Sequence, residues 1–179
     1  MGDGSGDLQS VWHIYVGQNI IHDSTILDLG SGLGKSKERL AVSNNIVATQ
    51  DIERSRMKNV DFIAQPASFL ANSYDYVTAF DVIEHATNPA DFLFHCWRIS
   101  IKGYFLTTPN KLIYDHPWHW TPEDFIEFTT HAFNLGPIRL EYFLRDKKPT
   151  GEDQILKVSE SEFLENKTYI QYGVFYAKN

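Results

Sequence analysis

Three glycines at alternate positions follow a short apolar run near the start of the chain. The run 26–29 leads into Gly30, Gly32 and Gly34, and a polar segment with helical character follows. Glycine allows a backbone to adopt positive φ and to approach a ligand closely. The pattern is typical of a strand that turns into a helix at a nucleotide-like cofactor site. An acid, Asp28, precedes the first glycine by two residues. A tight turn without a ligand is the alternative.

Spacing separates the cofactor loops that could occupy this turn. A phosphate-binding P-loop needs glycine where this chain has Leu29, so Gly-Lys-Ser at 34–36 supplies only the tail of that motif. A dinucleotide fingerprint, Gly-x-Gly-x-x-Gly, needs glycine where the chain has Lys35. The observed Asp-x-Gly-x-Gly-x-Gly fits neither loop.

Three further blocks follow the turn in the sequence. Residues 46–51 are a β-like run that ends in Asp51, whose carboxylate can accept hydrogen bonds from both hydroxyls of a ribose. Residues 74–85 form an apolar run that ends in Glu84 and His85, and residues 103–110 end in Thr-Pro-Asn. Each block pairs a strand-like run with polar groups at its carboxyl end.

Taken in order, the four blocks resemble class I S-adenosylmethionine-dependent methyltransferases of the small-molecule branch (types 11, 12 and 23) over residues 25–130. The resemblance implies S-adenosylmethionine as cofactor, with its methionine half beside the glycine turn and Asp28 helping to orient it. Gln65 lies where the family commonly has an acid for the adenine amino group. The cofactor-binding residues that we expect are Asp28, Gly30, Ser31, Gly32, Gly34, Asp51, Ile52, Gln65, Phe80, Asp81, Val82 and His85.

Candidate bases concentrate in residues 114–120, which hold two histidines, two tryptophans, a tyrosine and an acid. This segment follows the fifth predicted strand, at the edge where open α/β sheets bind ligands. Histidine titrates near neutral pH, and methyl transfer needs a base only when the acceptor is a hydroxyl or a protonated amine. We therefore expect His116 as the catalytic residue, with His119 and His85 as further candidates. Packing of these rings under a loop is the alternative, and the sequence suggests no metal site.

The composition of the chain limits which acceptors it can act on and in which compartment it is expected. The 179 residues are enough for one globular domain, and we expect residues 1–7 to be a flexible tail and residues 8–179 a single domain. A net charge of −7 without a basic stretch favours a small-molecule or sugar acceptor over nucleic acid. A single cysteine, Cys96, fits a buried thiol in a reducing cytoplasm. No secretory signal or membrane span is apparent, so we expect a cytoplasmic protein.

Hydrophobic periodicity predicts an α/β fold, a single Rossmann-like, doubly wound sheet of about seven strands. The family resemblance adds that the last strand is antiparallel and lies beside the fifth. Polar residues 145–168 are expected to be an excursion between the last two strands, and residues 52–59 leave room for only a turn of helix. The expected helices lie at 8–21, 33–42, 89–100 and from 122, and the expected strands at 25–29, 46–50, 60–64, 76–80, 104–108, 138–144 and 169–177.

The function that these observations favour is methyl transfer from S-adenosylmethionine to oxygen or nitrogen of a small molecule or sugar. A catalytically degenerate binding subunit is an alternative, because the link at 52–59 is short and Gln65 stands where the resembled family commonly has an acid for the adenine amino group. A nicotinamide-dependent oxidoreductase is a third hypothesis, and Lys35 at the third glycine position argues against it.

Overall fold

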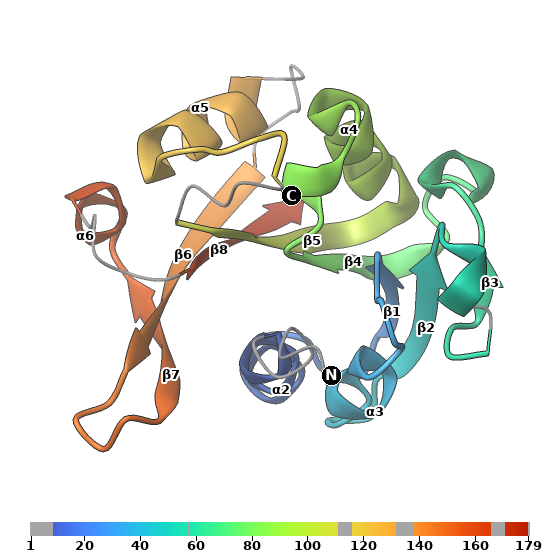
Figure 1. Cartoon of the computed structure of the whole chain (residues 1–179), viewed down its shortest axis with the longest axis horizontal. Helices are drawn as coiled ribbons and strands as arrows, with labels where there is room; N and C mark the ends of the chain where they lie inside the picture. Colours follow the sequence, from blue (N-terminus) through green and yellow to red (C-terminus); the bar gives the residue numbers. More distant parts are fainter. Residues whose placement is uncertain (1–8, 57, 111–115, 132–137, 166–170, 179) are drawn as a thin grey trace.

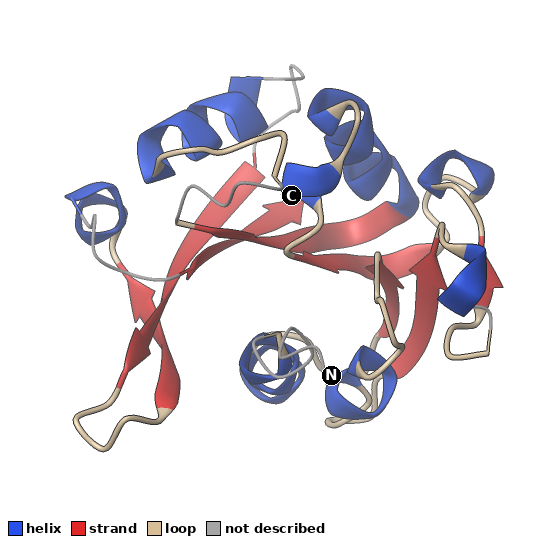
Figure 2. Ribbon diagram, in the orientation of Figure 1, coloured by secondary structure: helices blue, strands red, loops and turns tan. Residues whose placement is uncertain are grey.

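A single mixed sheet organises the chain (Figures 1 and 2). The computed structural model describes residues 9–56, 58–110, 116–131, 138–165 and 171–178, so the tail predicted for 1–7 lies outside the described residues. The strands are β1 (Thr25–Leu29), β2 (Ile46–Asp51), β3 (Phe62–Ile63), β4 (Tyr74–Phe80), β5 (Ser100–Pro109), β6 (Ile138–Lys147), β7 (Asp153–Val158) and β8 (Gln171–Lys178). Their order in the described sheet is β3-β2-β1-β4-β5-β8-β6-β7.

Strands β1 to β5 are parallel, and β8 pairs antiparallel with both β5 and β6. The predicted antiparallel strand beside the fifth is therefore confirmed, with Phe105 opposite Phe175. The sheet has eight strands among the described residues, whereas the sequence predicts about seven. Residues 145–168 are not only an excursion, because they contain β7, which pairs with β6, and a short helix. The polar composition of this segment conceals Ile155, which packs against the core.

Helices cover both faces of the sheet (Figures 1 and 2). The α-helices are α2 (Ser10–Asn19), α3 (Ser36–Leu40), α4 (Pro89–Ile99), α5 (Pro122–His131) and α6 (Glu160–Glu165), and the 3₁₀ turns are η1 (Arg54–Arg56), η2 (Pro66–Ser68) and η3 (Ile83–His85). Helices α2 and α3 lie on one face, and α4 and α5 lie on the other. The link after β2 contains only η1, as the short spacing predicts. None of the described helices is long and apolar enough to cross a membrane.

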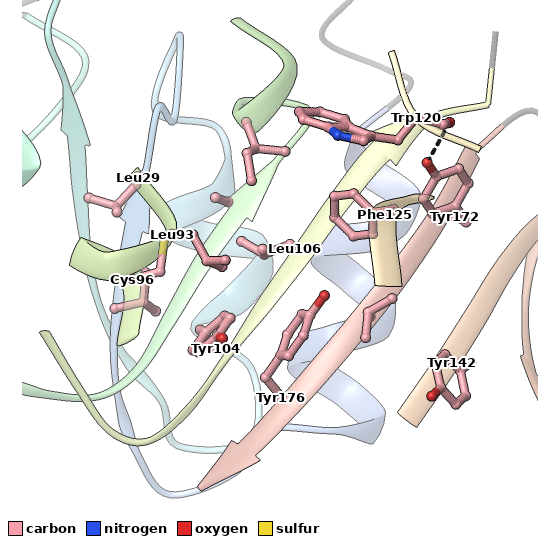
Figure 3. Close-up of a cluster of buried hydrophobic side chains, with 14 of the residues drawn as sticks. Leu29, Leu93, Cys96, Tyr104, Leu106, Trp120, Phe125, Tyr142, Tyr172 and Tyr176 are labelled. Carbon is pink, nitrogen blue, oxygen red and sulfur yellow. Dashed lines mark hydrogen bonds between the residues drawn. The ribbon is translucent and has the colours of Figure 1, made fainter. Parts of the chain in front are cut away.

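Two hydrophobic clusters fill the space between the sheet and its helices. On the face of α2, Trp12 and Val16 pack with Phe105 and Phe143. On the opposite face, shown in Figure 3, α4 contributes Leu93, and the buried residues around it include Cys96, Leu106, Trp120, Phe125, Tyr104, Tyr172 and Tyr176. Burial of these apolar side chains on both faces holds the helices against the sheet.

Local capping fixes the helices that border the site. The Asn88 side chain accepts a hydrogen bond of 3.2 Å from the backbone N–H of Asp91 and caps α4. At α5, Thr121 accepts a hydrogen bond of 3.1 Å from the backbone N–H of Asp124, and its hydroxyl donates to the Asp124 carboxylate at 2.8 Å. Because β1, β2, β4 and β5 are parallel, their carboxyl ends meet at one edge of the sheet. The candidate residues therefore gather at that edge.

Candidate cofactor-binding site

Strand β1 ends in a turn whose glycines adopt conformations that other residues avoid. The φ angles of Gly30, Gly32 and Gly34 are 66°, 60° and 69°. An added Cβ at Gly30 would lie 2.6 Å from a methyl group of Val82, and one at Gly34 would lie 1.8 Å from the Asn59 carbonyl oxygen. The pattern of alternate glycines thus reflects both positive φ and close packing.

Two side chains at the end of β2 accept hydrogen bonds from the backbone of this turn. The Asp51 carboxylate accepts hydrogen bonds from the backbone N–H groups of Gly32 at 3.0 Å and Glu53 at 2.9 Å. The Gln50 side-chain oxygen accepts from the Gly30 N–H at 3.1 Å, and the Gln50 amide nitrogen donates to the Ala64 carbonyl. Gln50 is buried and ties the turn to the loop after β3. Sequence reasoning missed Gln50, although a polar residue inside an otherwise β-like run was the available signal.

Asp28 lies beneath the turn and does not line either of the cavities described below. It is 1% exposed, and its carboxylate accepts a 2.7 Å hydrogen bond from the Thr78 hydroxyl. Burial raises the pKa of Asp28 to about 6, and the hydroxyls of Ser36 and Thr78 oppose that rise. The acid predicted to orient the cofactor thus packs β1 against β4, so any effect on a ligand is exerted through the turn.

Two adjoining cavities open above the turn. Their volumes are about 690 Å³ and about 290 Å³. Both are lined by Gly30, Asp51, Ile52, Val82 and His85, so they are two parts of one cleft. The larger volume falls within the range of about 300–1,000 Å³ typical of small-molecule sites.

The predicted cofactor residues divide into two groups around this cleft. Nine line at least one cavity: Gly30, Ser31, Gly32, Asp51, Ile52, Gln65, Asp81, Val82 and His85. The other three, Asp28, Gly34 and Phe80, line neither cavity. Phe80 is 2% exposed and belongs to the core under α2, where its ring packs on Phe105 at 5.9 Å.

The smaller cavity has a largely apolar wall. Gln65, Pro66 and Ala67 border it from η2 and the residue before it, and Phe92 borders it from α4. The loop after β3 contains no acid, as the sequence shows, but Asp91 at the start of α4 lines the same cavity. A flat heteroaromatic ring with polar edges matches this combination of apolar walls and polar groups.

The larger cavity is bordered by Asp81, whose backbone is held in the left-handed region with φ of 54°. The Asp81 N–H donates to the Thr107 hydroxyl at 3.0 Å, and that hydroxyl donates to the Asp81 carboxylate at 2.9 Å. The amide of Gln171 also donates to this carboxylate, and Gln171 in turn accepts from buried Arg145. Burial raises the pKa of Asp81 to about 6, while Thr107, Arg145 and Gln171 favour its charged form.

Two of the three candidate catalytic histidines are in contact, and the third lies apart from them. His85 lines both cavities, and its ring contacts the His116 ring edge-on with centroids 4.3 Å apart. His119 is exposed and lines neither cavity. Beside the two contacting rings is Glu84, which is 1% exposed. Burial, reinforced by the charge of Asp81, raises the pKa of Glu84 to about 9.

Comparison with known proteins relates part of the chain to a known family. Residues 27–107, which run from β1 to β5, match the family model of a methyltransferase domain. This segment, somewhat under half of the chain, therefore resembles a methyltransferase domain, and it lies in the parallel part of the mixed sheet. Among curated proteins, none matches the sequence significantly.

The chain shares its fold with solved structures of low sequence identity. One is an S-adenosylmethionine-dependent methyltransferase of Thermotoga maritima, described as a possible histamine N-methyltransferase (TM-score 0.69, 11% identity, covering 97% of this chain and 91% of that chain). Another is the complex of the Haloferax volcanii Trm112 methyltransferase activator with the putative methyltransferase (0.65, 14%, 97% and 91%). A third is the small RNA methyltransferase HEN1 (0.65, 16%, 97% and 25%). These likenesses show the fold of the chain and nothing of its substrate.

Proposed function

We propose that the chain binds S-adenosylmethionine in the two-part cleft and transfers its methyl group to oxygen or nitrogen of a small molecule or sugar. The observation that carries this proposal is the buried Asp51 carboxylate, which lines both cavities and fastens the glycine turn. Asp51 accepts hydrogen bonds from the ribose hydroxyls, and the turn at Gly30 and Gly32 brings the backbone close to the cofactor. The apolar wall formed by Pro66, Ala67 and Phe92 holds the adenine ring.

The bound cofactor supplies a methyl group already activated on a sulfonium. The protein has to orient the acceptor and, where necessary, accept its proton. His85 lies on the wall of both cavities, and His116 contacts it, so these two histidines are our candidates for contact with the acceptor. His119, three residues further along the loop, is exposed and away from the cleft, and we place it outside the catalytic group.

The acidic balance of the chain supports a small acceptor. A net charge of −7 disfavours the phosphate contacts that dominate nucleic-acid binding. The solved relatives include a possible histamine N-methyltransferase and a small RNA methyltransferase, so they represent both classes of acceptor. The charge favours the first class for this chain.

Calorimetric titration with S-adenosylmethionine and with S-adenosylhomocysteine tests the cofactor site. Asp51→Asn is expected to weaken binding by about 1–3 kcal/mol, or about 5- to 150-fold, because a hydrogen bond to a charged acceptor is lost. Asp23→Asn is the matched control. Asp23 is exposed, precedes β1 at the opposite edge of the sheet and should leave affinity unchanged. Equal affinities for the Asp51 and Asp23 variants would place the ribose elsewhere.

Release of S-adenosylhomocysteine measures turnover with candidate acceptors. We expect product with a member of a panel of small amines, alcohols and sugars, and none with short RNAs. His116→Ala should lower turnover more than cofactor affinity, whereas His119→Ala should change neither. Turnover confined to RNA would refute the proposed acceptor class while leaving the cofactor site intact.

A non-catalytic binding subunit is the second candidate function. The single 3₁₀ turn between β2 and β3 leaves that edge of the sheet with little helical cover, and one structural relative was solved in complex with an activator protein. This alternative predicts no titratable affinity for either cofactor form and a stable complex with a second protein.

A further inference from the structure

Loop 116–121 is fastened against the turn that follows β4. The Trp118 backbone N–H donates to the Glu84 carbonyl at 3.3 Å, and the Trp118 indole donates to the Ala86 carbonyl at 2.8 Å. Further along the loop, the Tyr172 hydroxyl donates to the Trp120 carbonyl at 2.8 Å, as Figure 3 shows. The loop is therefore tied to the turn at Trp118 and to β8 at Trp120, and the His116 ring lies against the His85 ring.

This fastening brings three metal-ligating groups to one point. One ligand atom from each of Glu84, His85 and His116 lies within 4.8 Å of the other two. Ligands at about 2.1 Å from a tetrahedral zinc ion stand about 3.4 Å apart. Closing the three groups around an ion therefore needs movements of about 1 Å, which small side-chain rotations provide.

The carboxylate in this group is an independent indication of a ligand. Glu84 is 1% exposed, and among the described residues no donor meets either carboxylate oxygen with standard hydrogen-bond geometry; the Thr108 hydroxyl is the nearby group that favours the charged form. Buried polar groups in proteins are nearly always paired, and an unpaired one costs free energy. A cation between Glu84 and the two imidazoles would satisfy these oxygens directly.

We propose that Glu84, His85 and His116 form a binding site for one divalent first-row transition-metal ion at the wall of the cofactor cleft. Two imidazoles and one carboxylate suit zinc, cobalt, iron or manganese better than magnesium, which prefers oxygen ligands. Three protein ligands leave coordination positions open, as in catalytic metal sites. His85 is exposed and lines both cavities, so these positions are accessible from the cleft.

A metal ion bound at this site would act on the methyl acceptor. Within the proposed function, an acceptor oxygen or nitrogen could occupy an open position and be oriented by the metal as a Lewis acid. In that case His85 and His116 act as ligands, and proton removal from the acceptor does not depend on either imidazole. This role rests on the proposed function, whereas metal binding itself does not.

Titration of the full chain, prepared without a histidine tag, with Co²⁺ tests the site. Visible absorption reports coordination by imidazole and carboxylate, and calorimetry gives the stoichiometry. We expect one Co²⁺ per chain, displaced by Zn²⁺ and retained in excess Mg²⁺. Glu84→Gln and His116→Ala should each weaken binding by at least about tenfold. The matched control is His119→Ala, in the same loop and exposed, which should leave binding unchanged.

Several results would overturn the site. They are absence of a Co²⁺ spectrum, displacement of Co²⁺ by Mg²⁺, or equal affinities of the His116 and His119 variants. Circular dichroism of each variant establishes whether it folds. If Glu84→Gln does not fold, His85→Asn provides a second ligand variant. Titration of the same samples with S-adenosylhomocysteine separates the two proposals, because loss of the metal alone should preserve cofactor binding.

Discussion

Replacing Gly34 with alanine tests whether the glycine turn is dictated by packing as well as by φ. The added Cβ would lie 1.8 Å from the Asn59 carbonyl oxygen, a backbone atom that cannot rotate away. Gly151 provides the matched control, since its φ is also positive, at 87°, but an added Cβ would meet nothing within 4 Å. The difference between the two variants therefore isolates the clash.

The magnitudes follow from these two environments. A left-handed alanine costs about 1–2 kcal/mol, partly offset by about 0.4–1 kcal/mol from a more restricted unfolded chain, so Gly151→Ala should lose about 1 kcal/mol. Gly34→Ala carries the same cost and an overpacking cost of about 1–3 kcal/mol, for a total near 3 kcal/mol. Typical domains have only about 5–15 kcal/mol of stability.

Urea unfolding followed by tryptophan fluorescence measures both losses, since the chain has four tryptophans. Equal losses in the two variants would show that Asn59 yields to the new methyl group at no cost. The turn would then depend on φ alone, and the argument from packing would be wrong.

Two further predictions concern buried polar groups. Burial, aided by the charge of Arg39, lowers the pKa of His13 to about 3, so the unfolded chain takes up a proton first as pH falls below the usual value of 6.5. This residue should therefore cost about 2 kcal/mol of stability between pH 7.5 and 5, and a pH series of unfolding curves should show a smaller loss for His13→Phe. Tyr172→Phe should lose about 1–2 kcal/mol in urea unfolding, because the buried hydrogen bond to the Trp120 carbonyl disappears. Tyr104→Phe should be nearly neutral, since the buried Tyr104 hydroxyl has no partner among the described residues; a similar loss in both variants would contradict this.

Most of the fold could be predicted from the spacing of residues that are close in the sequence. Apolar runs broken by glycine, asparagine and threonine caps predict the strands and helices from Thr25 to about His131, because their signals lie within a few residues of one another. Gly30, Gly32 and Asp51 could be placed at the cleft for the same reason, and their role in cofactor binding stays a prediction. The strand at 153–158 was hidden, because its pairing with β6 depends on a neighbour in the sheet more than on its own polar composition.

Side-chain roles at the site were less predictable, since they depend on distant partners. Asp28 has the sequence position expected of a cofactor ligand, but Thr78, 50 residues away, takes up its carboxylate. Gln171 reaches Asp81 across 90 residues. The convergence of Glu84 with His116 likewise depends on how the loop after β5 is fastened, and no spacing rule connects these positions.

The segment beyond the family match completes the electrostatics of the cleft. The match ends at Thr107, but Asp81 is held in place by Gln171 of β8, which accepts a hydrogen bond from Arg145 of β6. Arg145 is 1% exposed and also donates to Asp153 of β7 at 2.6 Å. Because a buried carboxylate is costly without a nearby cation, the three C-terminal strands help to keep Asp81 ionised at the cavity wall. The cleft therefore depends on strands beyond the matched segment for the charge of Asp81.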